Sequence, residues 1–376
     1  MNRIRREFCV ALSCGAASVF SRLTVSRSSD YTPEEFGAVG NGIGSDGRAL
    51  TRMINALNAH PGAGPLRVVC RGDYSLRGCD EIEPPPFGTP AAGRVVGLPP
   101  LLRDNVEIVA HESSFNVPND FLWRRVEKGG GSDDSFFVGW QLYGSSISFS
   151  GGRLVGCLSS RPSERGPKLS GFGGREFGFV LGGEGWQLNG VSVVEWGTDC
   201  ILAGSTGILN GSHISRGRRN NISVVPFKDD CDVLIRNCRI DRAGDWPEDL
   251  RNRPGAGLQV ESGRRGYEST VSVERCNFLG NREKDLQLSK GATRCTIVEN
   301  VFSNHVNLRP GNLGGHRIID NIFKGPARMD SVYGSADAPQ TIVSGNRFDI
   351  PAENAVRIRR LRHGKNFGQR PNVIID

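Results

Sequence analysis

The second half of the chain repeats one short apolar pattern five times. Each copy alternates apolar and polar residues and closes on a small polar residue, a spacer, and then Phe or Ile. The copies span 233–240, 271–278, 295–302, 316–323 and 341–348, and their last residues are 38, 24, 21 and 25 positions apart. A unit of roughly 20–50 residues that cannot bury its own apolar face is typical of a solenoid, in which units stack. We therefore expect short strands stacked in one coil, extended by weaker copies at 147–154, 186–193 and 207–214.

The composition agrees with many short strands and turns. Gly makes up 50 of 376 residues, which exceeds the usual share of about 7%. No apolar run approaches the roughly 18 residues of a membrane span. The net charge is +7, of which four Arg and one Glu in residues 1–26 account for +3. The remainder is only mildly basic, and its basic and aromatic residues match no nucleic-acid-binding module, so we expect no nucleic-acid partner.

The N-terminus predicts export. Arg5 and Arg6 precede an apolar stretch from Phe8 to Phe20, which fits a twin-arginine signal, although a flexible basic N-terminus is an alternative. We assign residues 1–29 to the export signal and a flexible lead, and expect a periplasmic or extracellular protein. Residues 30–376 then form one β-helix domain, with loop insertions near 80–103, 124–135, 156–175 and 242–256.

Ten cysteines are present, two of them in the predicted signal, and none forms a CxxC pair. A structural zinc site is therefore not expected. Cys238 and Cys276 hold the same place in successive copies, so stacking would bring them together. A buried thiol stack and a disulfide both remain open.

Residues 30–60 contain the one helical passage. Asp46 is expected to cap a helix that turns Leu50, Ile54 and Leu57 toward the core. The lead before it reads Glu35-Phe36-Gly37-Ala38-Val39-Gly40-Asn41-Gly42. This passage resembles the N-terminal signature of the pectate-lyase-like superfamily, with Asn41 in place of the usual Asp and Gly47 in place of Thr. The resemblance implies an all-β fold: a single-stranded right-handed parallel β-helix with a short N-terminal helical cap.

That superfamily includes lyases, hydrolases, epimerases and phage tailspikes, so the resemblance says little about chemistry. Neither the calcium cluster and Arg-x-Pro-x-x-Arg stretch of pectate lyases nor the Gly-His-Gly set of polygalacturonases is recognisable. No metal ligands are assigned, and calcium is a cofactor that only the resemblance suggests.

A second strand series lies between the repeats and places polar residues in columns. Alternation predicts that one set of side chains faces outward, on rungs about 4.8 Å apart. The first column holds Asn221, Gly257, Asp285 and His305. The middle one holds Ser223, Gln259, Gln287, Asn307, Arg328 and Arg357. The third holds Val225, Glu261, Ser289, Arg309, Asp330 and Arg359.

The columns indicate candidate site residues. Asp285 and His305 fall one rung apart, where a carboxylate beside His suits acid–base chemistry, and Arg309 suits neutralisation of a uronate. Glu261 and Asp285 are about 13–14 Å apart in this register, too far for a hydrolytic pair. Catalytic candidates are Asp285, His305 and Arg309. Candidates for substrate binding are Arg219, Asn221, Trp246, Gln259, Glu261, Gln287, Asn307, Arg328 and Asp330.

These residues, together with the resemblance, predict an exported protein that cleaves an acidic polysaccharide by β-elimination. A glycoside hydrolase of the same fold and a non-catalytic adhesin or tailspike-like binder are the alternatives. The expected partner is a polysaccharide substrate, and monomer and trimer remain open.

Overall fold

A computed structural model describes residues 30–82, 95–118, 136–156, 175–245, 255–261, 267, 269–288, 293–308, 314–329, 339–349 and 373–375. The predicted export signal and lead lie outside the described residues, as do Trp246, Arg309 and Asp330. Much of each predicted loop insertion also lies outside them. The first insertion nevertheless contributes two short strands, β3 and β4, at its described ends.

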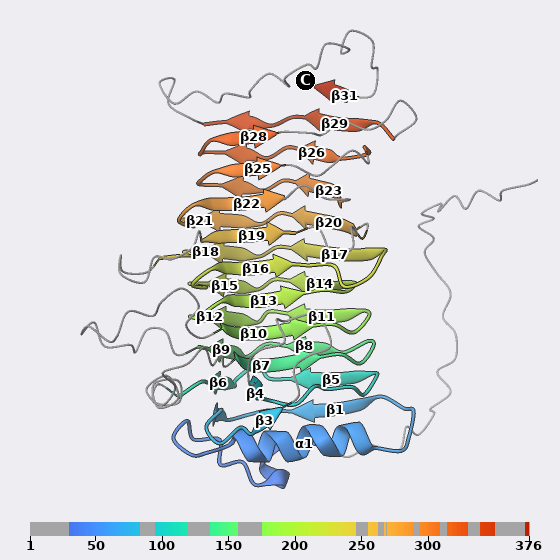
Figure 1. Ribbon diagram of the computed structural model, residues 1–376, viewed down its shortest axis with the longest axis vertical. Helices are drawn as coiled ribbons and strands as arrows, with labels where there is room; N and C mark the ends of the chain where they lie inside the picture. Colours follow the sequence, from blue (N-terminus) through green and yellow to red (C-terminus); the bar gives the residue numbers. More distant parts are fainter. Residues whose placement is uncertain are drawn as a thin grey trace, which may run out of the picture.

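The described strands form three sheets that run side by side along one axis (Figure 1). The chain passes from sheet A to sheet B to sheet C and then starts the next rung. The pairings are parallel, apart from the antiparallel contact of β3 with β4. This is the all-β parallel solenoid that the repeats predict, with the apolar faces of all three sheets turned inward.

Sheet A has 11 strands: β1 (Leu66–Val69), β5 (Val106–Val109), β8 (Ser148–Ser150), β11 (Trp186–Asn189), β14 (Gly207–Asn210), β17 (Cys231–Arg236), β20 (Ser269–Glu274), β23 (Thr293–Val298), β26 (Arg317–Ile319), β29 (Thr341–Ser344) and β31 (Val373–Ile375). Sheet B has 10 strands: β2 (Asp73–Ser75), β6 (Ser114–Asn116), β9 (Arg153–Val155), β12 (Ser192–Val194), β15 (His213–Ser215), β18 (Arg239–Asp241), β21 (Asn277–Leu279), β24 (Val301–Phe302), β27 (Ile322–Phe323) and β30 (Arg347–Phe348). Sheet C has 10 strands: β3 (Glu81–Ile82), β4 (Val95–Gly97), β7 (Phe136–Leu142), β10 (Arg175–Leu181), β13 (Asp199–Ala203), β16 (Asn220–Val224), β19 (Ala256–Val260), β22 (Lys284–Leu288), β25 (Val306–Leu308) and β28 (Ala327–Met329).

Each predicted repeat strand is two strands separated by a corner. Residues 233–240, for example, supply most of β17, a turn, and the start of β18. The turn residue adopts left-handed backbone angles, at Asn237 (φ 55°), Arg275 (φ 51°), Glu299 (φ 57°) and Asp320 (φ 56°). A single residue in this region bends the chain sharply. Alternation resumes directly after the bend, so the sequence pattern reads as one continuous strand.

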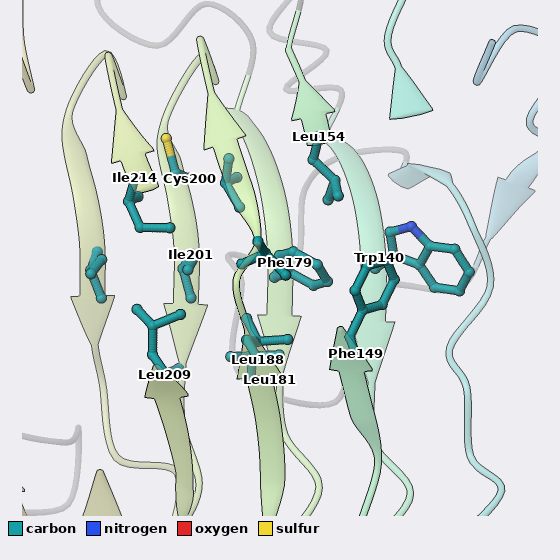
Figure 2. Close-up of a cluster of buried hydrophobic side chains, with 14 of the residues drawn as sticks. Trp140, Phe149, Leu154, Phe179, Leu181, Leu188, Cys200, Ile201, Leu209 and Ile214 are labelled. Carbon is teal, nitrogen blue, oxygen red and sulfur yellow. The ribbon is translucent and has the colours of Figure 1, made fainter. Parts of the chain in front are cut away.

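Stacked apolar side chains from all three sheets fill the interior. Figure 2 shows them in the middle rungs, where Phe179 of sheet C packs against Phe149 of sheet A; their ring centroids are 5.2 Å apart. In later rungs the closing aromatic residues of the repeats form a column. Its neighbouring ring centroids are 4.9, 5.2 and 5.0 Å apart, along Phe278, Phe302, Phe323 and Phe348. These distances match the spacing of rungs, so the repeated apolar position is one continuous core column.

The small polar residues before that column line the corner between sheets A and B. The side-chain Oδ1 of Asn300 accepts the backbone N–H of Cys276 at 2.9 Å, and Asn321 accepts that of Asn300 at 3.0 Å. Asn346 does the same for Asn321 at 3.1 Å. Cys238 and Cys276 are buried free thiols, which matches the thiol-stack alternative rather than the disulfide. A hydrogen bond with Cys238, together with burial, raises the pKa of Cys276.

Helix α1 (Gly47–Ala59) covers the end of the coil beside β1 (Figure 1). It follows a short 3-10 helix, η1 (Pro33–Phe36), and buries Leu50, Ile54 and Leu57, as predicted. Asp46 holds the N-cap position, as predicted, and its carbonyl accepts the Leu50 N–H at 3.0 Å, but its side chain makes no hydrogen bond to the helix. Its carboxylate instead accepts the N–H groups of Val39 at 2.7 Å and Ser75 at 3.0 Å, tying the lead loop to β2. No helix of the described part is long and apolar enough to cross a membrane.

Candidate functional site

The register of sheet C confirms the predicted middle column from Ser223 to Arg328, while its last member, Arg357, lies outside the described residues. Ser223 pairs with Gln259, Gln259 with Gln287, and Gln287 with Asn307. Asn307 pairs with Arg328, whose side chain lies outside the described part. Apolar neighbours on both sides of each column residue face the core, so the column faces outward. The strands of sheet C therefore place amide and hydroxyl side chains one above another.

The prediction that Asn221 and Asp285 also face outward is wrong, because both side chains are fully buried. Sheet C strands begin at the corner after sheet B, and in β13, β16 and β22 two successive residues turn inward there. In β13 these are Cys200 and Ile201, both part of the core. Asn221 and Asp285 hold the Cys200 position in β16 and β22.

Asp285 satisfies backbone and amide donors inside this corner. Its carboxylate accepts the side-chain amide of Asn281 at 2.9 Å and the backbone N–H of Asn304 at 2.6 Å. Asn221 extends the network, because its amide donates to the carbonyl of Asp241 at 2.7 Å and to Oδ1 of Asn281 at 3.3 Å. Burial raises the pKa of Asp285, opposed by the hydrogen bonds that it accepts. These contacts give Asp285 a structural role at the corner.

His305 lies on the rung next to Asp285, as predicted, because its carbonyl accepts the Asp285 N–H at 2.8 Å. The two side chains do not share a face. His305 is half-buried at the surface, whereas the Asp285 carboxylate lies inside the corner. The acid–base pair expected from the columns is therefore not assembled on the outer face.

Arg219 lies where the chain enters β16 and forms a two-pronged ion pair. Its Nε donates to Oδ1 of Asp199 at 2.9 Å and its Nη2 to Oδ2 at 2.5 Å. The Asp199 carboxylate raises the pKa of Arg219, and Glu261 adds to the effect. The guanidinium thus stays charged but is largely neutralised by a buried partner, and with Asn220 it contacts the Ser223 hydroxyl.

The middle column reaches the surface at Gln259 and Gln287, which are half-buried. Gln259 donates its side-chain amide to Glu261 at 2.9 Å, and Gln287 accepts Lys284 Nζ at 2.5 Å. Asn307 is only 8% exposed, and among the described residues its Oδ1 has no hydrogen-bond partner. A buried amide oxygen without a donor is costly, so this position favours a donor from a ligand or water. We call Gln259, Gln287 and Asn307 the amide column.

The same outer face is partly apolar in earlier rungs. The column continues from Ser223 to Leu202 and Val180, and then to Gln141. Val180, Phe177 and Val138 form a buried cluster of their own, separate from the core. The amides of sheet C that reach the surface therefore lie in the later rungs.

The columns predicted from the sequence do not include a charged cluster on sheet B. Asp241 faces outward, since Ile240 beside it is in the core, yet it is covered by cationic side chains. Arg239 Nε donates to Asp241 Oδ2 at 2.6 Å, and His213 Nε2 lies 3.3 Å from Oδ1. The register pairs His213 with Arg239, so aligning the first strand series would have placed these residues together.

The described residues include no group of three or more His, Cys, Asp or Glu side chains that could hold a metal ion. The clusters on sheets B and C are ion pairs and amide networks, and the chemistry they offer is hydrogen bonding and charge.

Comparison with known families supports the architecture. Residues 195–302 match the family described as "Right handed beta helix region". The matched stretch covers the rungs from the end of β12 to β24, which include the Asp241 cluster and most of the amide column. The chain is thus a right-handed parallel β-helix, as the resemblance implied. No curated protein matches the sequence.

Solved structures that align with this chain share little sequence with it. The ORF18 protein of Geobacillus virus E2 aligns with a TM-score of 0.51 at 10% identity, covering 85% of this chain and 59% of the viral protein. PfbA, a surface adhesin of Streptococcus pneumoniae, gives 0.42 at 11% identity, with 86% and 91% covered. The A-module of the Azotobacter vinelandii mannuronan C-5 epimerase AlgE6 gives 0.33 at 13% identity, with 86% and 100% covered. The first of these similarities concerns the fold alone.

Proposed function

We propose that this right-handed parallel β-helix protein binds a polysaccharide along the outer face of sheet C. The observation that carries the proposal is the amide column, in which side chains able to donate and accept hydrogen bonds repeat about every 4.8 Å. A sugar polymer presents hydroxyl groups that both donate and accept, so a row of amides complements it.

The unfilled acceptor of Asn307 supports a ligand that brings donors. Its Oδ1 is buried and lacks a partner among the described residues. A sugar hydroxyl would supply the missing hydrogen bond. The neighbouring Lys284 and Glu261 carry opposite charges and half-buried side chains, so the described face balances its charge and accepts neutral as well as acidic sugars.

Cleavage by β-elimination is a second candidate, favoured by the half-buried His305 two residues before Asn307. A histidine in this place suits a base that removes a sugar C5 proton. An acidic glycan incubated with the protein would then yield an unsaturated uronide that absorbs in the ultraviolet. In that case His305→Ala abolishes the signal with little change in melting temperature. A hydrolase instead raises reducing ends without ultraviolet absorbance, and a binding protein does neither.

The binding proposal is tested by titrating acidic and neutral oligosaccharides, polygalacturonate and galactomannan fragments among them, into the protein in a calorimeter. The double variant Gln259→Ala with Gln287→Ala removes two amide partners. At about 0.5–1.5 kcal/mol for each hydrogen bond, the loss corresponds to roughly tenfold in Kd.

Gln187→Ala is the matched control, because Gln187 is an exposed glutamine on strand β11 of sheet A. We expect this variant to bind like the parent. The proposal is abandoned if the sheet A variant loses as much affinity as the double variant, or if no oligosaccharide of either kind binds the parent protein.

A further inference from the structure

The Asp241 cluster presents positive charge on a face separate from the amide column. Asp241 is 1% exposed, whereas the side chains of Arg239, Arg242 and His213 around it are 58%, 51% and 39% exposed. Arg239 Nε lies 2.6 Å and Arg242 Nε 3.7 Å from the carboxylate. The buried acid thus holds a set of cations whose other sides face solvent.

The charges of the cluster do not cancel. Two guanidinium groups and one carboxylate leave a net charge of +1 with His213 neutral and +2 with it protonated. Burial raises the pKa of Asp241, but hydrogen bonds from His213, Ser215 and Arg239 outweigh it and hold this pKa well below its usual range. Asp241 therefore remains an anion at ordinary pH, and it orients the cations rather than being displaced by protonation.

The register extends the positive charge along the axis. Arg153 pairs with Ser192, Ser192 with His213, and His213 with Arg239. These positions share one outward column, with rungs about 4.8 Å apart. Arg153 is exposed two rungs before His213. The result is a basic column, consisting of Arg153, His213 and Arg239 with Arg242 beside its end.

We propose that the basic column binds the anionic groups of an acidic polysaccharide laid along sheet B. Guanidinium groups present a planar fork of N–H donors that matches carboxylate and sulfate oxygens. A polymer bearing an anion at regular intervals meets several of these cations at once. Ser192 and Asn277 lie in the same column, next to His213 and Arg239, and their side chains suit hydrogen bonds to sugar hydroxyl groups rather than stacking on bases. This site is independent of the amide column and of the proposal made for it.

The probes are a polygalacturonate oligomer, a sulfated oligosaccharide, a neutral dextran oligomer and a single-stranded oligonucleotide. Binding is measured by titration calorimetry of the full chain at low and at physiological ionic strength. We expect the two acidic glycans to bind, with affinity that falls as salt rises. Arg239→Gln with Arg242→Gln should weaken them at least about tenfold, since each substitution removes one charged hydrogen-bond donor from the column.

Arg347→Gln is the matched control. Arg347 lies on strand β30 of the same sheet, four strands away from β18, and its replacement removes one positive charge, as Arg153→Gln does. We expect less than about a twofold effect. Removal of Arg239 takes away a partner of the buried Asp241 carboxylate and so affects folding as well as binding. Arg153→Gln, remote from Asp241, therefore serves as a second variant with an expected loss of about threefold.

The site is refuted if Arg347→Gln loses as much affinity for the acidic glycans as the double variant. It is also refuted if dextran binds as tightly as the acidic glycans, or if Arg153→Gln binds them with unaltered affinity. Tighter binding of the oligonucleotide than of either acidic glycan assigns the column to a nucleic acid and overturns the proposal too. If only the amide-column variants lose affinity, the site on sheet C is supported and the site on sheet B is refuted.

Discussion

Two sets of polar residues on the same strands of sheet C differ in where their side chains lie: one set is buried at a corner and the other reaches the outer face. Asp285 and Gln287 are two positions apart in β22, and alternation treats them as equivalent. Asp285 is fully buried and bonded to Asn281 and Asn304, whereas Gln287 lies half-buried on the outer face. The difference arises because a strand that follows a corner turns two successive residues inward. In a solenoid, distance from the corner decides whether a polar residue holds the fold or meets a ligand.

The largest expected effect comes from the corner. Asp285→Ala leaves the amide of Asn281 and the N–H of Asn304 without their acceptor, at about 1–3 kcal/mol for each unsatisfied buried donor. We expect a loss of about 3 kcal/mol in the free energy of unfolding, measured by urea denaturation. A value near zero would show that Asp285 belongs with the outer residues and not with the corner.

Asn300→Ala tests the second corner in the same way. Its Oδ1 accepts the Cys276 N–H at 2.9 Å, and its Nδ2 donates to the Val273 carbonyl at 2.8 Å. We expect a loss of about 2 kcal/mol in unfolding free energy, with unchanged oligosaccharide affinity. Weaker binding without destabilisation would contradict the assignment of Asn300 to the fold.

Asp241→Asn probes a residue intermediate between the buried corner residues and the outer-face residues. Asp241 faces outward but is covered by Arg239 and His213. The lowered pKa of Asp241 means that its carboxylate stabilises the folded state above the unfolded pKa of about 3.9 and loses that effect as pH falls. The variant should melt at a lower temperature at pH 7. The gap between variant and parent should narrow below about pH 4, as thermal melts over this range will show. A constant gap would mean that the charge of Asp241 contributes nothing.

The smallest effect is expected on the outer face. Gln287→Ala should change the free energy of unfolding by no more than about 0.5 kcal/mol, because it is a surface substitution whose partner Lys284 can turn to water. The same denaturation assay as for Asp285→Ala gives the comparison directly. A cost comparable to that of Asp285→Ala would erase the distinction between corner and face.

The sequence predicts the repeat and the rung register well, because stacking demands one apolar position per rung. The alignment of Gln259, Gln287 and Asn307 follows from that demand. The corners were not predictable, since a single left-handed residue such as Asn237 leaves the alternation on both sides intact. Asn221 and Asp285 looked like surface residues because strict alternation does not show that two successive residues turn inward at the corner between sheets B and C. The Asp241 cluster was not predicted because its members lie on sheet B strands, which the sequence pattern shows only as the ends of the preceding sheet A strands.

The asparagine ladder at the corner between sheets A and B also has a mechanical meaning. Asn300, Asn321 and Asn346 each bond to the backbone of the adjacent rung, so a line of amides joins the rungs in addition to the hydrogen bonds of the three sheets. A pull on the last rung meets the resistance of one rung at a time. The coil should then yield in discrete steps of one turn, each with a similar force, rather than rupture as a whole.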